Sequence, residues 1–133
     1  MLTRTHARFG HAVLVDCHSM PSTRDGASRR IRPDFVLGDR DGTTCDPAFT
    51  QVVAGAARTF GYTVAINDPY KGVELVRKHG RPAENRHSLQ VELKRTLYMD
   101  ERTLVPNAGY ARLQNDLARL VEILAAFVEP ALA

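Results

Sequence analysis

The sequence predicts a single α/β domain in which a mixed central sheet is flanked by helices. Three observations predict this class: short apolar runs that end in turn residues, longer segments with helical spacing of apolar residues, and the succession of both kinds along the chain. With 133 residues, the chain can bury a core without disulfides or a structural metal. We therefore expect residues 1–133 to form one domain.

The first third of the chain contains a helix-like segment and two apolar runs. Gly10 is a typical helix end, and Pro, Ser, Gly and Arg residues without periodicity favour a long loop after the first strand. The expected elements are, in order, the last turns of a helix at 2–9, a strand at 11–17, a loop at 19–32, a strand at 34–38 and a turn at 39–44.

The strongest helix signal follows this turn. Asp46 is a typical N-cap, and Pro47 suits the first helical position. Gly61 is expected to end the helix. Its predicted buried face consists of apolar residues at helical spacing: Phe49, Val52, Val53, Ala56 and Phe60.

The second half of the chain predicts a buried strand at 62–66, which ends in a turn at 67–70. Residues 72–79 fit either a helix or a strand. A second strand at 87–95 alternates, with Leu89, Val91 and Leu93 on one face and Ser88, Gln90, Glu92 and Lys94 on the other. A long helix at 110–128 has one apolar stripe: Leu113, Leu117, Leu120, Val121, Leu124 and Phe127.

Composition excludes several classes of protein. The formal charge is +3, but basic residues are scattered among acids, so we expect no nucleic-acid partner. The apolar runs are shorter than the ~20 residues that cross a bilayer, so we expect no membrane partner. Cys17 and Cys45 do not form a disulfide framework, and no signal peptide is evident. We therefore expect a reducing, cytoplasmic location.

The first strand ends in an acid, a thiol and an imidazole. Because side chains alternate along a strand, Asp16 and His18 should share one face and Cys17 should lie on the other. The alternative is that Asp-x-His only closes the strand with polar turn residues. A thiol hydrolase built from Cys17 and His18 is disfavoured because they point apart, so we expect Cys17 to be a buried apolar filler.

The acidic segment 38–42 lacks the lysine and hydroxyl of a phosphate-binding loop.

Five ordered segments carry a family resemblance: 15–21 (VDCHSMP), 33–39 (PDFVLGD), 67–72 (NDPYKG), 80–82 (GRP) and 90–93 (QVEL). Together they resemble the N-formylglutamate amidohydrolase family over about residues 7–127. The resemblance implies the fold of zinc-dependent exopeptidases (phosphorylase/hydrolase-like) and the hydrolysis of N-formylglutamate to glutamate and formate, a reaction of histidine degradation. The chain resembles only the C-terminal half of the family, so we expect this fold to be incomplete.

The resemblance implies that His18 is one ligand of a catalytic zinc ion, with two further ligands in the N-terminal half. A catalytic zinc takes three protein ligands and acidifies a bound water. The remaining histidines show no metal-ligand spacing with His18: His6, His11, His79 and His87. We therefore expect zinc to be absent or weakly bound in this chain alone.

Glu92 matches the carboxylate that acts as general base in the family. Such a carboxylate accepts a proton from water and delivers it to the departing amine. Without the resemblance, Glu92 is one more polar residue on a solvated strand face. Asp16 is expected either to orient His18 from a second shell or to cap the turn.

The implied substrate carries two carboxylates, which favour bidentate binding by arginine. The candidates that the resemblance indicates for substrate binding are Arg77 and Arg81, then Arg40, Lys71 and Asn67. The sequence departs from the family pattern at Val73 and at Lys78-His79, which leaves the substrate open.

The leading hypothesis is part of a metal-dependent hydrolase that acts on a small N-acyl amino acid. The alternative is a stand-alone, metal-free remnant or interaction domain that keeps the fold without chemistry. In either case we expect self-association through the apolar surface that the missing half would cover.

Overall fold

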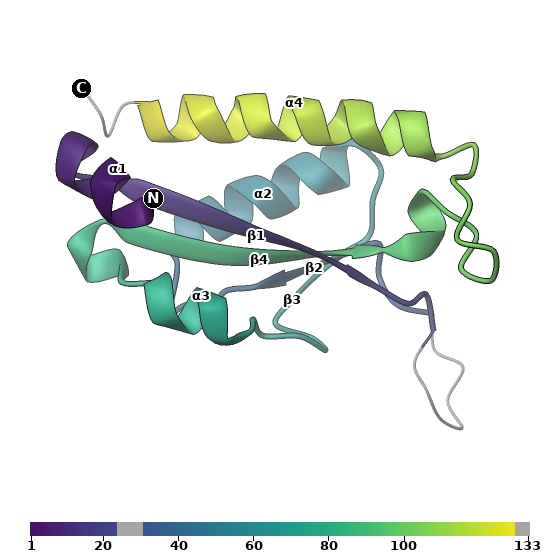
Figure 1. Ribbon diagram of the computed structural model, residues 1–133, viewed down its shortest axis with the longest axis horizontal. Helices are drawn as coiled ribbons and strands as arrows, with labels where there is room; N and C mark the ends of the chain where they lie inside the picture. Colours follow the sequence, from purple (N-terminus) through teal and green to yellow (C-terminus); the bar gives the residue numbers. More distant parts are fainter. Residues whose placement is uncertain (24–30, 130–133) are drawn as a thin grey trace.

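A computed structural model describes residues 1–23 and 31–129. The chain forms a four-stranded mixed sheet with helices on both faces (Figure 1), which confirms the predicted α/β class. The helices are α1 (Leu2–Phe9), α2 (Pro47–Thr59), α3 (Glu74–His79) and α4 (Tyr110–Val128). The strands are β1 (Ala12–Met20), β2 (Phe35–Gly38), β3 (Val64–Ile66) and β4 (Arg86–Lys94), and two short 3-10 helices flank β4 at Pro82–Glu84 and Arg95–Leu97.

The sheet has the order β1-β4-β2-β3, which places β4 inside it. β1 runs parallel to β4, and their register pairs His18 with Glu92. β2 runs antiparallel to β4, so Val36 lies opposite Glu92 on the other side. Glu92 therefore lies in the middle of the sheet, with a strand on either side.

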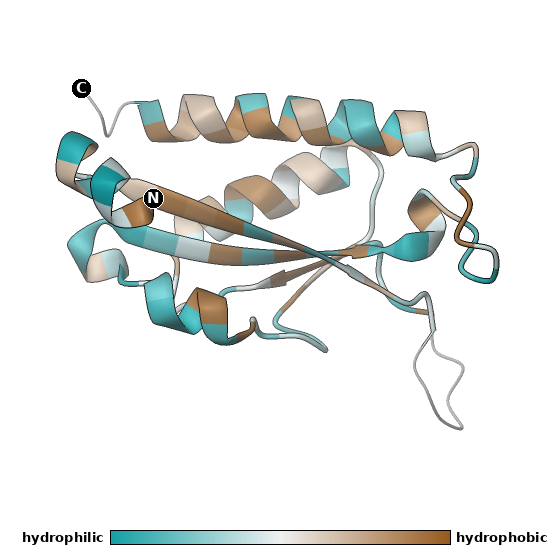
Figure 2. Ribbon diagram, in the orientation of Figure 1, coloured by the Kyte–Doolittle hydropathy of each residue, from teal (hydrophilic) through white to brown (hydrophobic). Residues whose placement is uncertain are grey.

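The main core lies between the sheet and the helix layer formed by α2 and α4 (Figure 1). Figure 2 shows the hydrophobic side of α4 turned toward the sheet. Most of the buried residues of this core come from three sources: Phe35, Leu37, Leu89 and Val91 from the strands, Phe49, Val53, Ala54 and Ala57 from α2, and Leu113 and Leu120 from α4; Cys45 and Tyr62 lie just before and after α2. The opposite face of the sheet carries α3, whose Val76 is fully buried.

α2 starts as predicted, because the Asp46 carboxylate accepts a hydrogen bond from the Ala48 amide at 2.8 Å. Its buried face is rotated from the predicted one and consists of Phe49, Thr50, Val53, Ala54 and Ala57. The predicted Val52, Ala56 and Phe60 are only half-buried. The small Ala54 and Ala57 face the core, and the buried Thr50 hydroxyl donates to Asp39 Oδ2 at 2.8 Å.

Other element boundaries differ from the sequence prediction. β1 continues to Met20 instead of ending at 17, and the ambiguous segment 72–79 forms the helix α3. β3 is a half-buried edge strand of three residues, not a buried strand, because among the described strands it pairs with β2 alone. Much of the predicted loop, residues 24–30, lies outside the described residues.

β1 forms the other edge of the sheet, and the apolar residues around it are only partly shielded from solvent. Cys17 is exposed, so the prediction of a buried filler is wrong; an edge strand has a neighbour on one side only. α4 has the predicted bounds, yet Val121 is 66% exposed and Phe127 is 40% exposed. A groove of about 260 Å³ runs between β1 and α4, lined by Val13, Val15, Phe49, Val121, Leu124, Ala125 and Val128.

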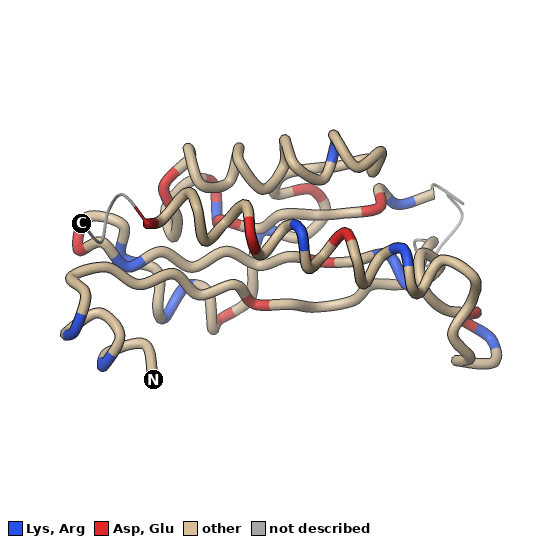
Figure 3. Tube along the Cα trace, turned by 90° about the horizontal axis from the view of Figure 1, so that it is seen from above, with Lys and Arg blue, Asp and Glu red and all other residues tan. Residues whose placement is uncertain are grey.

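Charged residues of both signs alternate over the molecule (Figure 3), in line with the scattered charges of the sequence. None of the helices in the described part of the chain has the length and apolar character needed to cross a bilayer.

Candidate active site

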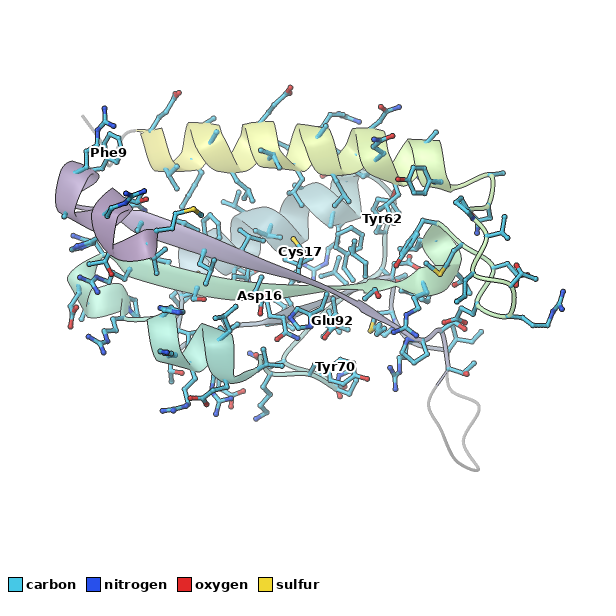
Figure 4. All side chains as sticks on the ribbon, in the orientation of Figure 1. Phe9, Asp16, Cys17, Tyr62, Tyr70 and Glu92 are labelled. Atoms are coloured by element: carbon cyan, nitrogen blue, oxygen red, sulfur yellow. The ribbon has the colours of Figure 1, made fainter. Side chains whose placement is uncertain are left out.

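Three titratable side chains meet on the sheet face that also carries α3. β1 contributes Asp16 and His18, and β4 contributes Glu92. His18 Nε2 lies 3.0 Å from Asp16 Oδ2, and His18 Nδ1 lies 3.9 Å from Glu92 Oε1. Figure 4 shows Asp16 and Glu92 on the side of the sheet that faces Tyr70. The strand alternation read from the sequence thus places this acid and this imidazole on one face, as predicted.

Glu92 is only 7% exposed, so the alternative of a solvated strand face is wrong. Burial raises the pKa of the Glu92 carboxyl, although the nearby His18, a hydrogen bond from Gln90 and the charge of Arg32 oppose this shift. The strand lies inside the sheet, which the alternating pattern alone does not reveal. A buried carboxylate with a raised pKa in a polar cluster is a candidate for proton transfer.

The pair of Asp16 and His18 has a defined protonation pattern. An ionised carboxylate can only accept hydrogen bonds, so His18 Nε2 carries the proton that it donates to Asp16 Oδ2. In the neutral ring this leaves Nδ1 with a free lone pair. That nitrogen is the one that faces Glu92.

Arg32 and Tyr70 belong to the same region, although the sequence did not single them out as site residues. Arg32 Nη1 donates to the Tyr70 hydroxyl at 2.6 Å, and the guanidinium lies 5.2 Å from the Tyr70 ring centroid. Arg32 Nε is buried and has no hydrogen-bond partner within residues 1–23 and 31–129. The residues come from different loops, so only the folded chain reveals the pair.

Three predicted substrate-binding residues lie beyond the ends of β2 and β3 and are held by other protein groups. The Asn67 amide donates to Asp39 Oδ1 at 2.7 Å and accepts from the Asp39 backbone at 3.1 Å. Arg40 Nη1 donates to the Gly72 carbonyl at 3.0 Å. Lys71 forms an exposed ion pair with an aspartate at 2.7 Å. These contacts fix the loops next to the candidate site.

The other two predicted substrate-binding residues lie farther from the cluster. Arg77 is exposed on α3 and pairs with Glu74. The Arg81 backbone amide donates to Arg86 at the start of β4. Glu92 lies near the other end of that strand, about 20 Å away at the usual rise per residue. The structure does not bring Arg81 to His18 and Glu92.

The described residues do not form a zinc site by themselves. Within them, no group of three or more His, Cys, Asp or Glu side chains could hold a metal ion. His11 and His87 lie together, with ring centroids 5.1 Å apart, but on the opposite face and toward the other end of β4. The predicted metal ligand His18 lies in the cluster with Asp16 and Glu92, and its Nδ1 is the ring nitrogen that does not bind Asp16.

Comparison with known sequences identifies the family. The model of the family described as N-formylglutamate amidohydrolase matches residues 1–99. The N-formylglutamate deformylase of Pseudomonas aeruginosa is 39% identical over 101 residues, which cover 75% of this chain and 38% of that protein. The deformylase of Pseudomonas putida is 37% identical over the same length, with the same coverage.

One solved structure gives the same assignment over more of the chain, and a second shows the same fold. N-formylglutamate amidohydrolase from Ralstonia eutropha JMP134 is 48% identical, with a TM-score of 0.91 over 96% of this chain and 47% of that one. An Agrobacterium tumefaciens gene product, 19% identical, has a TM-score of 0.67 over 96% of this chain and 48% of that one, and shows the fold alone.

The chain spans less than half the length of the curated relatives and of the Ralstonia structure. The family model ends at residue 99, before α4, whereas the Ralstonia match covers nearly the whole chain. The chain belongs to the N-formylglutamate amidohydrolase family.

Proposed function

We propose that this chain supplies part of the active site of an enzyme that hydrolyses N-formylglutamate to glutamate and formate. The observation that carries the proposal is the buried Glu92 carboxylate, which faces His18 across two paired strands. The names of the relatives support the substrate and the reaction class. Similarity to zinc-dependent exopeptidases, as the family resemblance implies, is part of the proposal.

In this reaction, Glu92 accepts a proton from the attacking water as the water oxygen bonds to the formyl carbon. It then delivers the proton to the nitrogen of glutamate as the carbon–nitrogen bond breaks, which releases formate. Burial suits this role, because it raises the pKa of Glu92 and so favours its temporary protonation. Gln90 and His18 approach one oxygen of the carboxylate, Oε1.

We also propose that His18 is a zinc ligand through Nδ1, with Asp16 fixing its tautomer and ring orientation. The other ligands must come from residues outside those described, because the described residues do not complete a site. When bound, zinc would acidify water. Titrating zinc into this chain joined to the remainder of the family fold, with and without His18→Ala, tests this assignment; equal affinities would contradict it.

A carboxylate of the substrate is proposed to bind Arg32. Its guanidinium is oriented by Tyr70, has an Nε–H without a partner among the described residues and is close enough to act on Glu92 electrostatically. The sequence candidates Arg40, Lys71 and Asn67 already bind protein groups, so they are better suited to shape this region than to bind substrate.

Glu92→Gln tests the central assignment. We expect formate release from N-formylglutamate to fall by about 10²- to 10⁴-fold, the usual contribution of a general base. The measurement needs a preparation that deformylates, either the chain alone or the chain joined to the remainder of the family fold. Glu122→Gln on the exposed face of α4 is the matched control. Undiminished activity of Glu92→Gln would refute the role of Glu92.

The second candidate is an interaction domain that keeps the fold without chemistry. The specific observation that favours it is the edge strand β1 beside the apolar groove along α4. An exposed strand edge with apolar surroundings promotes association. Under this candidate, the chain would associate normally, whereas Glu92→Gln would change no activity in any preparation.

A further inference from the structure

Gln90 is the buried polar side chain closest to the proposed general base along β4. It lies two residues before Glu92 and therefore on the same face of the strand. Only 1% of its surface is exposed, although it carries an amide that needs partners. Its hydrogen bonds therefore decide how this part of the sheet is organised.

The orientation of the Gln90 amide follows from its neighbours. The Val73 backbone N–H donates to Gln90 Oε1 at 2.8 Å. A backbone N–H can only donate, so the atom that faces it must be the amide oxygen. The amide nitrogen then points the other way, where it donates to Glu92 Oε1 at 2.7 Å. Neither contact would survive rotation of the amide by 180°.

The Val73 donor is itself held in place. Gly72 adopts φ +109°, a conformation that favours glycine, and its backbone packs against Gly38 of β2. A Cβ atom at Gly38 would lie 2.6 Å from the Gly72 nitrogen, so this approach is closer than other residues allow. The Arg40 backbone amide also donates to the Lys71 carbonyl at 2.8 Å. The segment before α3 is therefore fixed to the sheet.

These contacts leave the two oxygens of Glu92 in different environments. Oε1 accepts from Gln90 and lies 3.9 Å from His18 Nδ1. Oε2 has no hydrogen bond to the residues that the structure describes. The carboxylate is thus held by one oxygen, and the other is available to a water or a substrate.

We infer that Gln90 is a positioning residue, which ties Glu92 Oε1 to the segment before α3 and leaves Oε2 for proton transfer. The inference rests on the proposed function, because the proton transfer by Glu92 is a step of that proposed reaction. The restraint itself is a property of the folded chain and can be measured without turnover. Catalytic groups need such support, because small displacements reduce rates strongly.

Gln90→Glu tests the two hydrogen bonds of the amide separately, because it keeps one and removes the other. An ionised glutamate, present at a pH high enough to deprotonate both carboxyls, keeps an oxygen that can accept from Val73, but it replaces the donor to Glu92 with a second carboxylate oxygen. We expect the Val73 amide to stay protected from hydrogen exchange, while the Glu92 side chain populates more than one rotamer in NMR coupling measurements. Gln51→Glu, the same change at an exposed position of α2, should alter neither signal.

Gln90→Met removes both bonds at similar volume. Here the Val73 amide should exchange about 2- to 10-fold faster, the factor expected for one lost hydrogen bond, and Glu92 should again lose its single rotamer. A folded Gln90→Met variant in which Glu92 keeps one rotamer would overturn the inference, because Gln90 would then only fill the core.

The unmodified chain provides a test that does not depend on folding of a variant. The Gln90 side-chain amide should exchange with solvent more slowly than the exposed Gln51 amide, and equal rates would overturn the inference. These readouts are independent of deformylation. A restrained Glu92 together with a fully active Glu92→Gln enzyme would refute the proposed function and leave the restraint in place.

Discussion

Asp16 holds His18 by a hydrogen bond of 3.0 Å between residues two positions apart on one strand. The acceptor character of the carboxylate fixes the proton on Nε2 and leaves Nδ1 directed toward Glu92. The acid and the imidazole therefore form a hydrogen-bonded pair whose geometry is set by the alternation of β1.

Asp16→Asn tests this pair. An asparagine amide offers a donor as well as an acceptor, so it no longer enforces one tautomer of His18. Replacement of such an outer partner lowers metal affinity or activity by about 10- to 100-fold. With this chain joined to the remainder of the family fold, we expect a loss in this range for zinc affinity in titration calorimetry, and no loss for Asp100→Asn in an exposed loop. Unchanged affinity in Asp16→Asn would show that Asp16 only closes the strand.

Arg32→Lys tests the proposed carboxylate binding. A lysine keeps the charge but lacks the planar fork, so it cannot reproduce both the Tyr70 bond and bidentate binding of substrate. We expect a raised KM for N-formylglutamate with a smaller change in kcat. Arg58→Lys on the exposed side of α2 is the control. If Arg32→Lys left KM unchanged, the substrate carboxylate would bind elsewhere.

His87 makes stability depend on pH. The Asp46 backbone amide donates to His87 Nδ1 at 3.0 Å, which requires the neutral ring. Burial, then the nearby His11, lowers the pKa of His87 below its usual value of 6.5. Because the unfolded chain binds the proton more readily, the contribution to stability is complete above pH 6.5 and is lost as the pH falls through the lower, folded-state pKa.

Urea unfolding between pH 7.5 and pH 5 measures this dependence. His87→Gln keeps an acceptor without a titrating ring, so its free energy of unfolding should vary less with pH in that interval than that of the unmodified chain. His79→Gln on α3 serves as the comparison. Parallel curves for the unmodified chain and His87→Gln would contradict the assignment.

Two glycine-to-alanine changes should have opposite effects. Gly38→Ala places a methyl group 2.6 Å from the Gly72 nitrogen and 2.7 Å from the Lys71 carbonyl carbon. We expect it to lower the free energy of unfolding by about 1–3 kcal/mol, as overpacking does. Gly55 lies within α2 with open space around its Cβ position, so Gly55→Ala should stabilise by about 0.5–1 kcal/mol. Thermal denaturation of both variants checks the pair.

We expect the chain to self-associate through β1 and the adjoining groove. Val121 lines this groove and is 66% exposed, so Val121→Lys should lower the mass measured by light scattering at high concentration. Leu104 is 67% exposed but lies in the loop before α4, and Leu104→Lys should leave the mass unchanged. A monomeric unmodified chain would refute the expectation.

Local sequence patterns predicted an element well when a single rule, such as helix capping, an apolar stripe or strand alternation, determines it. Asp46 and Pro47 marked the start of α2, and the apolar stripe at 110–128 gave the bounds of α4. Period-two alternation placed Asp16 and His18 on one face. These features depend on residues close together in the sequence, so the sequence contains the information directly.

Long-range pairing explains what the sequence could not predict. Whether a strand is central or at an edge depends on its partners, so Cys17 proved exposed and Glu92 proved buried. The partnership of Arg32 with Tyr70 joins two loops that no periodicity connects. The predicted roles of Arg77 and Arg81 came from the resemblance alone, and both side chains have local partners at the surface: Glu74 on α3 for Arg77 and Glu84 in the following 3-10 helix for Arg81.

The pairing of Ala12 with Arg86 has a consequence for biosynthesis. β1 is made before β2, α2, β3 and α3, but β4, the strand that it joins, is made only after them. A nascent chain therefore presents the apolar residues Val13-Leu14-Val15 without a strand partner while it emerges from the ribosome. Until β4 follows, this unpaired apolar strand is a site for aggregation or for binding by chaperones.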